Sequence, residues 1–344
     1  MSALSGLRSS VRGRVTCPGD EGFGQARTPW NLAVEQPVLA VVEAVDAGDV
    51  SAVLRYAHSA GISVTVRPSG HAASGNTADA ILLRTGLLDQ VQVDAGRRTA
   101  RIGAGVRSGQ VQAVAAGHGL TGMPGNSSIV SVTGYTLGGG LSWLARKYGW
   151  AAGHVTAFQV VDAAGEQARV TAASDPDLFW ALRGGGGDFA VVTAMEYTLH
   201  AEPLMFSGRM MWPVGRAQDV LAAFIAATAS APEELTLWAN LLQLPGSPPL
   251  AAIDVLYLGQ EQRARDLMVA FDRIEGLISD SRAVLPVSRL GPIGAEATGP
   301  APLRWRGELL TGLDEAGVRA LLQDPIDPLV NVQIRHVGGA LSRG

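Results

Sequence analysis

A helical repeat of apolar residues is the clearest early pattern in the chain, between residues 46 and 61. Its apolar positions recur at intervals of three and four residues, which places them on one face of a helix: Val50, Val53, Leu54 and Ala57. Asp46 or Asp49 can cap the start of this helix, and Gly61 can end it. The pattern therefore predicts an amphipathic helix with one side packed on a core.

Strand patterns surround that helix. Short runs that alternate or stay apolar between turn residues predict strands at residues 37–43, 63–67, 80–84, 91–94 and 99–103. A second helix is predicted at residues 108–116. The 43 glycines gather at the junctions of these elements, which favours a domain whose backbone approaches a ligand closely.

The following stretch predicts a hairpin, a helix and a strand. Residues 155–162 and 168–171 flank an Ala-Ala-Gly turn, as in a β-hairpin. Residues 175–183 carry proline and acidic side chains in what would be the first turn of a helix, and the glycines at 184–187 stop it. A strand is predicted at residues 189–199.

A different pattern begins at Pro203. Long alternating runs predict strands at residues 205–212, 235–244 and 251–258, and helical spacing appears at residues 217–229 and 261–274. This order predicts an antiparallel sheet with helices on one face. We therefore expect an α+β protein with two domains, residues 1–202 and residues 203–344.

Composition and charge narrow the possible partners. With 47% hydrophobic and 17% charged residues, the 344-residue chain can bury a large core. Its net charge of -4, without basic clusters interleaved with aromatic residues, argues against nucleic acid as a partner. The single cysteine, Cys17, excludes an intramolecular disulfide and a cysteine-built metal site, and the histidines lack metal-ligand spacing, so no metal is expected. The sequence shows neither a secretory signal nor an apolar run long enough for a bilayer, so we expect a soluble cytoplasmic protein without membrane partners.

Two common site types do not match. The segment Gly103-Ala-Gly105-Val-Arg-Ser-Gly109 has its third glycine one residue too late for a nicotinamide-binding fingerprint, and no acid follows at the expected distance. A tight turn explains it better. No Gly-x-Ser-x-Gly elbow indicates a serine hydrolase.

Three glycine-bearing segments carry the strongest functional signal. They are Val64-Thr-Val-Arg67-Pro-Ser69-Gly70-His71, the stretch from Gly134 through Gly138-Gly-Gly140 to Gly149, and Leu178 through the four glycines to Val192. Taken singly, His71 also fits a solvated histidine, and each glycine run also fits a flexible turn or a helix end. Glycines can also present backbone N–H groups to a pyrophosphate.

Together these segments resemble the FAD-linked oxidases of the berberine-bridge-enzyme type, in the vanillyl-alcohol oxidase and p-cresol methylhydroxylase superfamily. The resemblance extends from Pro18 to Leu341. It implies a two-subdomain FAD-binding domain of the p-cresol methylhydroxylase (PCMH) type, followed by an antiparallel substrate domain. It also implies FAD as cofactor, covalently bound through a ring nitrogen of His71, which would withdraw electrons from the flavin and retain it.

The resemblance assigns further residues to the cofactor. The implied FAD-binding residues besides His71 are Arg67, Pro68, Ser69, Gly70, Ala72, Ser127, Val132, Thr133, Gly134, Thr136, Leu137, Gly138, Gly139, Val191 and Val192. Many family members carry a cysteine for a second covalent link where this chain has Ser127, so we expect one link only. Ser142 and Gly153 also depart from the family, where glycine and aspartate are common.

The family implies the chemistry as well. Its members transfer a hydride from an alcohol or amine C–H bond to the flavin, with molecular oxygen as acceptor. His336 and Gln333, on a strand that resembles the family's substrate sheet, are the expected catalytic residues, with His336 as the base. Family members continue well beyond this strand, so we expect either a truncated chain or a natural short variant.

Three functions stay open at this point. They are an oxidase, a dehydrogenase that uses another acceptor, and a non-catalytic flavin-binding remnant. Sugars, secondary alcohols, alkaloid amines and polyketide-like phenols all fit the family as small-molecule substrates. Substrate-domain residues such as Trp238 and Asn240 cannot be ranked, and the sequence indicates no oligomeric state.

Overall fold

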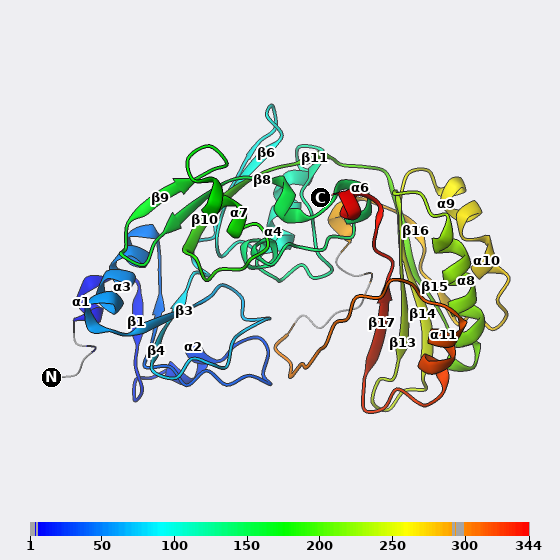
Figure 1. Ribbon diagram of the computed structural model, residues 1–344, viewed down its shortest axis with the longest axis horizontal. Coiled ribbons are helices and arrows are strands. Elements are labelled where there is room, and N and C mark those ends of the chain that lie inside the picture. Colours follow the sequence, from blue (N-terminus) through cyan, green and yellow to red (C-terminus); the bar gives the residue numbers. More distant parts are fainter. Residues whose placement is uncertain (1–3, 5, 291–292, 294–298, 344) are drawn as a thin grey trace. The chain divides into compact units, whose positions relative to one another are not determined.

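The computed structural model describes residues 4, 6–290, 293 and 299–343, and the chain forms two compact units (Figure 1). Unit 1 comprises Met1–Leu141, Trp150–Ala201 and Ala297–Trp305. Unit 2 comprises Ser142–Gly149, Glu202–Glu296 and Arg306–Gly344. Two short segments thus belong to a unit other than the one that surrounds them in sequence. A domain boundary after residue 202 remains our proposal.

Unit 1 is built around two sheets. Its strands are β1 (Arg14–Thr16), β2 (Ala40–Glu43), β3 (Ser63–Arg67), β4 (Ala80–Arg84), β5 (Val91–Asp94), β6 (Thr99–Gly103), β7 (Leu120–Thr121), β8 (Val155–Val161), β9 (Gln167–Val170), β10 (Val191–Thr198) and β11 (His200–Ala201). Its helices are α1 (Leu7–Ser10), α2 (Phe23–Arg27), α3 (Ala47–Ala60), α4 (Ser108–Ala116), α5 (Val132–Leu137), the 3-10 helix η1 (Ala151–His154) and α7 (Pro176–Ala181).

The first sheet has the order β1-β2-β4-β3, and β2, β4 and β3 run parallel. Helix α3 connects β2 to β3 and packs Val50 and Val53 against Val42 and Ile81. The other face of the sheet contacts α2 through Leu82. Because both faces are covered, β2 and β4 read as continuous apolar runs.

The ends of α3 confirm the sequence prediction. Asp46 is the N-cap, and its side chain accepts a hydrogen bond from the backbone N–H of Asp49. Gly61 ends the helix in the left-handed conformation at φ 64°. A polar acceptor at one end and a residue without a Cβ at the other satisfy the free backbone groups of the helix termini.

The second sheet of unit 1 has the order β5-β6-β10-β8-β9 and is antiparallel. The predicted hairpin is confirmed as β8 and β9. A backbone hydrogen bond from Val106 N–H to Gly103 C=O forms the predicted tight turn after β6. A Cβ on Gly103 would lie 2.1 Å from the carbonyl oxygen of Leu88, so the glycine there serves backbone packing.

Unit 2 is one antiparallel sheet with helices on one face. Its strands are β12 (Met205–Pro213), β13 (Leu235–Leu242), β14 (Leu250–Leu258), β15 (Ser279–Asp280), β16 (Ala283–Leu285) and β17 (Asn331–Arg335). Its helices are α6 (Ala145–Tyr148), α8 (Ala217–Ala229), α9 (Glu261–Leu267), α10 (Val269–Asp272), α11 (Glu315–Leu322) and the 3-10 helices η2 (Val214–Arg216), η3 (Val287–Arg289) and η4 (Gly339–Arg343).

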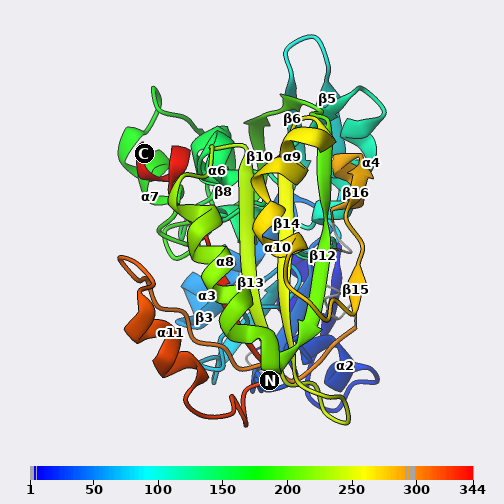
Figure 2. The same cartoon turned by 90° about the vertical axis from the view of Figure 1, so that its right-hand side faces the viewer.

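Helices α8, α9 and α10 lie over β12, β13 and β14, as predicted for this half of the chain (Figure 2). The strand order is β15-β12-β14-β13-β17, and β16 also pairs with β12. The helix predicted over residues 261–274 is divided at Met268, whose ψ of 9° ends α9. No glycine or proline marks this break, so the helical spacing alone could not predict it.

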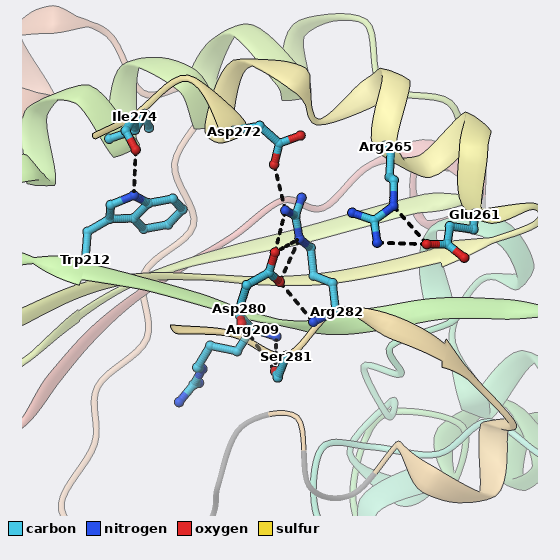
Figure 3. Close-up of polar contacts among 9 residues, drawn as sticks. All are labelled: Arg209, Trp212, Glu261, Arg265, Asp272, Ile274, Asp280, Ser281 and Arg282. Carbon is cyan, nitrogen blue, oxygen red and sulfur yellow. Dashed lines mark hydrogen bonds and ion pairs between the residues drawn. The ribbon is translucent and has the colours of Figure 1, made fainter. Parts of the chain in front are cut away.

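An ion-pair cluster joins the edge of this sheet to α10 (Figure 3). Arg282, whose side chain is 3% exposed, contacts Asp280 of β15 at 2.7 Å and Asp272 of α10 at 2.6 Å. Asp280 and Asp272 keep 30% and 40% of their side-chain surface exposed. One buried cation therefore links β15 to α10.

Candidate functional site

The site in unit 1 begins at the edge where two parallel strands end. β3 and β4 are paired in parallel, so the residues after Arg67 and Arg84 lie at the same edge of the sheet. The first strand leads into Pro68-Ser69-Gly70-His71 and the second into Thr85. Ligands of open sheets with crossover helices commonly bind beyond the carboxyl ends of the strands.

Gly70 allows the loop after β3 to pass over another segment. Its φ is 85°, and a Cβ there would lie 2.9 Å from the backbone nitrogen of Trp30. The carbonyl of Gly70 accepts a hydrogen bond from Asn31 N–H at 3.2 Å. A side chain at this position would therefore be both strained and blocked.

Arg67 anchors the same loop from beneath. Its guanidinium donates to the carbonyls of Ala26 and Arg27, both at 2.6 Å, and to the side chain of Gln36. Burial, with a smaller effect of the Arg84 charge, lowers the pKa of Arg67 to about 10. Its donors are used on the protein itself, so Arg67 shapes the site as a buried support.

His71 is held on two sides. Its ring stacks on the indole of Trp30, with centroids 4.3 Å apart and planes 17° apart. Nδ1 lies 3.1 Å from Oγ of Ser69. Nε2 is buried and has no hydrogen-bond partner among the described residues. Burial, followed by the charge of Arg107, lowers the pKa of His71, which favours a neutral imidazole.

The second glycine segment lies beside the first. The side chain of Ser131 caps α5 by accepting from Gly134 N–H, and its hydroxyl donates to the carbonyl of Ala104 at 2.9 Å. The backbone N–H of Ser131 donates to Oγ of Ser69 at 3.4 Å. A Cβ on Gly134 would lie 3.4 Å from Pro68. Ser69 thus connects His71 to the start of α5.

The glycine triplet directly follows α5, and the next helix, α6, begins only at Ala145. The N–H groups of Gly138 and Gly139 both donate to the carbonyl of Thr136. Gly140, at φ 75°, is enclosed, because a Cβ would lie 2.6 Å from the side chain of Ala151. The triplet therefore ends a helix in a crowded turn, and these two N–H groups are already bonded within the chain.

A cavity of about 830 Å³ joins these segments. The predicted cofactor residues on its wall are Arg67, Pro68, Ser69, Gly70, His71, Ala72, Thr133, Gly134, Leu137, Gly138, Val191 and Val192. The pairing of Val191 with Val161 brings the start of β10 to the end of β8, so residues 161–163 also contribute. Ser127, Val132, Thr136 and Gly139 do not line this cavity in the part of the chain that the structure describes.

Three buried polar atoms on the cavity wall test its fit to a cofactor. Nε2 of His71 and the hydroxyls of Thr85 and Thr133 lack a hydrogen-bond partner among the described residues. A buried polar group without a partner is destabilising, so such atoms on one cavity wall indicate a polar ligand. The volume and these donors and acceptors fit FAD. Within the described residues, no group of histidine, cysteine and acidic side chains could hold a metal ion.

Several residues of this wall are not among the individual cofactor residues predicted from the sequence. Thr85 directly follows a predicted strand, and the parallel pairing of the strands at residues 63–67 and 80–84 would have indicated it. Gly186, Gly187 and Phe189 also line the cavity. Trp30, in contrast, lies outside every periodic segment, so its stack on His71 had no local signal.

The predicted catalytic residues lie in unit 2, where β17 pairs with β13. Gln333 donates to Oδ1 of Asn240 at 2.8 Å and accepts from Arg335 at 2.6 Å. Asn240 in turn donates to Asp254, which is fully buried and paired with Arg209. Gln333 is thus one member of a polar network on the sheet face that helices α8 to α10 do not cover.

His336 follows β17, and its contacts bear on its predicted role as the base. Its Nε2 lies 3.1 Å from Nη1 of Arg146, which can only donate. Burial and then the charge of Arg146 lower the pKa of His336 to about 4. A general base needs a free lone pair and a pKa near the working pH. The structure therefore argues against His336 as the catalytic base.

Comparison with known proteins agrees with the cavity. A family model described as an FAD binding domain matches residues 38–171. The chain is 30% identical over 294 residues to (R)-6-hydroxynicotine oxidase of Paenarthrobacter nicotinovorans. This match covers 85% of the present chain and 61% of that oxidase. It is 33% identical over 229 residues to the FAD-dependent monooxygenase FUP4 of Fusarium proliferatum. This second match covers 64% of the present chain and 44% of FUP4. The matched part of the chain thus spans between 44% and 61% of the length of these relatives.

Solved structures give the same fold. Crystalline 6-hydroxy-D-nicotine oxidase from Arthrobacter nicotinovorans matches with a TM-score of 0.77 at 27% identity, over 85% of this chain and 66% of that one. The berberine-bridge-enzyme-like protein 1 of Physcomitrella patens matches with a TM-score of 0.78 at 20% identity, over 94% and 74%. The α+β architecture expected from the sequence is confirmed. None of the described helices is both long and apolar enough to cross a membrane.

Proposed function

The chain belongs to the FAD-linked oxidases of the berberine-bridge-enzyme type, and from this we propose that it is an FAD-dependent oxidase that removes a hydride from an alcohol or amine carbon. The observation that carries the proposal is the cavity of unit 1, with unpartnered polar atoms of His71, Thr85 and Thr133. Bound FAD supplies the two-electron acceptor. Molecular oxygen is the proposed final acceptor.

We propose that FAD is attached to the protein at His71 alone. Ser69 contacts Nδ1, which leaves Nε2 as the nitrogen available to the cofactor. Burial lowers the pKa of His71, which favours the neutral imidazole with a lone pair on one ring nitrogen. Ser127 cannot supply a second link of the cysteine type and does not line the cavity.

The remaining residues of the wall hold and enclose the cofactor. Thr85 and Thr133 would donate or accept hydrogen bonds, and the backbone at Val191 and Val192 would pack beside it. Arg67 and Gly70 support the loop that carries His71. In unit 2, we assign Gln333 and His336 to holding the sheet together, since both are engaged by other side chains.

Intact mass on acid-denatured protein is the first test. The mass of one FAD retained by the wild type and lost in His71→Ala would support the tether. A mass without flavin, together with FAD released into the filtrate, would leave FAD binding standing and remove the covalent link. A colourless protein that does not bind added FAD would overturn the proposal.

Substrate and acceptor are tested next. The name of the relative from Paenarthrobacter makes 6-hydroxynicotine the first amine to try, and the matched chitooligosaccharide oxidase makes oligosaccharides the first alcohols. Flavin bleaching without oxygen identifies a substrate, and hydrogen peroxide under air identifies an oxidase. Bleaching that air does not reverse would favour a dehydrogenase. Bound flavin that no candidate bleaches would favour a non-catalytic remnant. The cytoplasmic location stays a prediction.

A further inference from the structure

The indole of Trp30 stacks on the ring of His71. The two rings lie 17° from parallel with centroids 4.3 Å apart. The imidazole of a histidine can rotate about two side-chain torsions. A hydrogen bond to one ring nitrogen fixes the position of that nitrogen, but the ring can still rotate about the hydrogen bond. Contact with Ser69 fixes where Nδ1 lies. The stack on Trp30 then fixes the orientation of the ring, and with it the direction of Nε2.

The segment that carries Trp30 is itself bound on the side of the His71 loop. Asn31 N–H donates to the carbonyl of Gly70 at 3.2 Å. Arg67 reaches the carbonyls of Ala26 and Arg27 just before it. The segment that carries Trp30 is therefore hydrogen-bonded along the loop that carries His71.

A distant segment binds it on the other side. The side chain of Asn31, which is 6% exposed, donates to the carbonyl of Leu303 and accepts from the N–H of Leu303, both at 2.9 Å. Backbone hydrogen bonds from Ala301 N–H to Trp30 and from Leu32 N–H to Ala301 continue the contact. We name residues 299–303 the strap. Asn31 and Leu303 are 272 positions apart in the sequence.

We propose that Trp30 positions the imidazole of His71 for attachment of the flavin, and that the clamp of Asn31 on Leu303 keeps Trp30 in place. This inference rests on the tether proposed at His71. In the attachment, one N–H of the imidazole and one C–H of a flavin methyl group break and one C–N bond forms. Two electrons and two protons pass through the flavin to molecular oxygen, which leaves as hydrogen peroxide.

The placement has a consequence for assembly. The strap follows strands β12 to β16 of unit 2 in sequence and precedes β17, but it belongs to unit 1. His71 is therefore fully positioned only after the chain has been made as far as Leu303 and the strap has docked. The rate at which flavin becomes covalently attached therefore depends on whether the strap has docked.

The test separates attachment from binding. Apo-protein is mixed with saturating FAD under air, and the covalent fraction is followed by intact mass after acid denaturation. Noncovalent affinity is measured separately by flavin fluorescence in a His71→Ala background. Trp30→Leu removes the flat ring, and we expect attachment to slow by about tenfold or more, because a misplaced reacting group loses rate steeply. FAD affinity in the His71→Ala background should change by less than about twofold.

Two further variants and a control sharpen this test. Trp30→Phe keeps a ring on which His71 can stack, so it should restore attachment to within about threefold of the wild type. Asn31→Ala keeps Trp30 and removes the clamp, so it should slow attachment by about threefold or more. Trp180→Leu replaces an indole that is 76% exposed in the same unit and should leave attachment unchanged.

The outcomes are distinguishable. Attachment at the wild-type rate in Trp30→Leu overturns the positioning role and leaves the proposed function intact. Equal loss in Trp30→Leu and Trp30→Phe, with weaker FAD binding, also overturns it, since a general structural defect would then explain both. Should Trp30→Leu not fold, Asn31→Ala and Trp30→Phe decide the matter. A wild type that binds FAD but never attaches it overturns this inference together with the tether.

Discussion

Arg146 donates a hydrogen bond from Nη1 to Nε2 of His336 over 3.1 Å, within unit 2. The same guanidinium donates to the carbonyls of Leu235 and Val337 at 2.7 and 2.8 Å, so its position is fixed by the backbone. Because arginine only donates, the proton of the neutral His336 ring lies on Nδ1. His336 is therefore an acceptor that helps to hold the segment of Arg146 against β13.

Lowering the pH from 7 to 4 should destabilise the protein through His336. Its pKa in the folded chain is about 4, below the ordinary 6.5, so the unfolded chain binds a proton first as the pH falls. The contribution of this residue to stability is present above about pH 6.5 and is lost progressively toward pH 4. Urea unfolding at a series of pH values measures this slope.

The matched variant is His336→Gln, which can still accept from Arg146 and does not titrate. We expect a shallower slope between pH 6.5 and 4 and a loss of about 1 kcal/mol at pH 7. His200, whose pKa is also lowered to about 4, titrates in both proteins and cancels in the comparison. An unchanged slope would contradict the prediction. Loss of flavin reduction by a factor of about 100 or more would restore His336 as the base.

Gly70→Ala should destabilise unit 1 more than another glycine with positive φ does. The new Cβ would lie 2.9 Å from the backbone nitrogen of Trp30, and a backbone atom cannot give way as the end of a flexible side chain can. The control is Gly19→Ala, at φ 95° with no described heavy atom within 4 Å of its Cβ. We expect about 1 kcal/mol for the control from backbone strain alone, and about 1–3 kcal/mol more for Gly70→Ala from the clash. Equal losses in thermal or urea unfolding would refute the close approach.

Local patterns were sufficient for much of unit 1. Asp46 and Gly61 predicted both ends of α3 because caps are satisfied by the residue itself and its near neighbours. Helix α5 was missed, although Ser131 is a standard N-cap, because Gly134 inside it and Gly138 after it disfavour a helix. Contacts with Ser69 and Pro68 compensate there, and these come from a different part of the chain.

Side-chain roles depended on tertiary contacts and were harder to predict. The motif predicts where the cofactor loop lies in the sequence. Nothing in the neighbouring residues indicates that Arg67 donates its hydrogen bonds to the carbonyls of Ala26 and Arg27. The sequence predicts His336 as a base, and only the structure shows that its Nε2 faces Arg146. A motif identifies residue types, whereas charge and burial are set by residues far away in sequence.

Thr133→Val should affect the empty and the cofactor-bound protein in opposite directions. The Thr133 hydroxyl is buried without a partner among the described residues, so an isosteric methyl should stabilise the apo-protein by about 1 kcal/mol. If the hydroxyl bonds to FAD, the Kd for FAD in a His71→Ala background should rise about fivefold, since one hydrogen bond is lost. Thermal unfolding and flavin fluorescence measure the two effects. A more stable apo-protein with unchanged affinity would remove Thr133 from the cofactor site.

Arg282→Ala should strongly destabilise unit 2 because one buried cation serves two carboxylates (Figure 3). Its removal leaves Asp272 and Asp280 without the guanidinium that contacts both of them, and it breaks the link between β15 and α10. Since both acids keep some exposure to water, we expect about 3 kcal/mol in urea unfolding, at the lower end for broken buried pairs. The matched control is Arg216→Ala, whose pairs with Asp219 and Glu275 are exposed, and for which we expect less than about 1 kcal/mol. Similar losses for the two arginines would show that burial of Arg282 does not set its contribution.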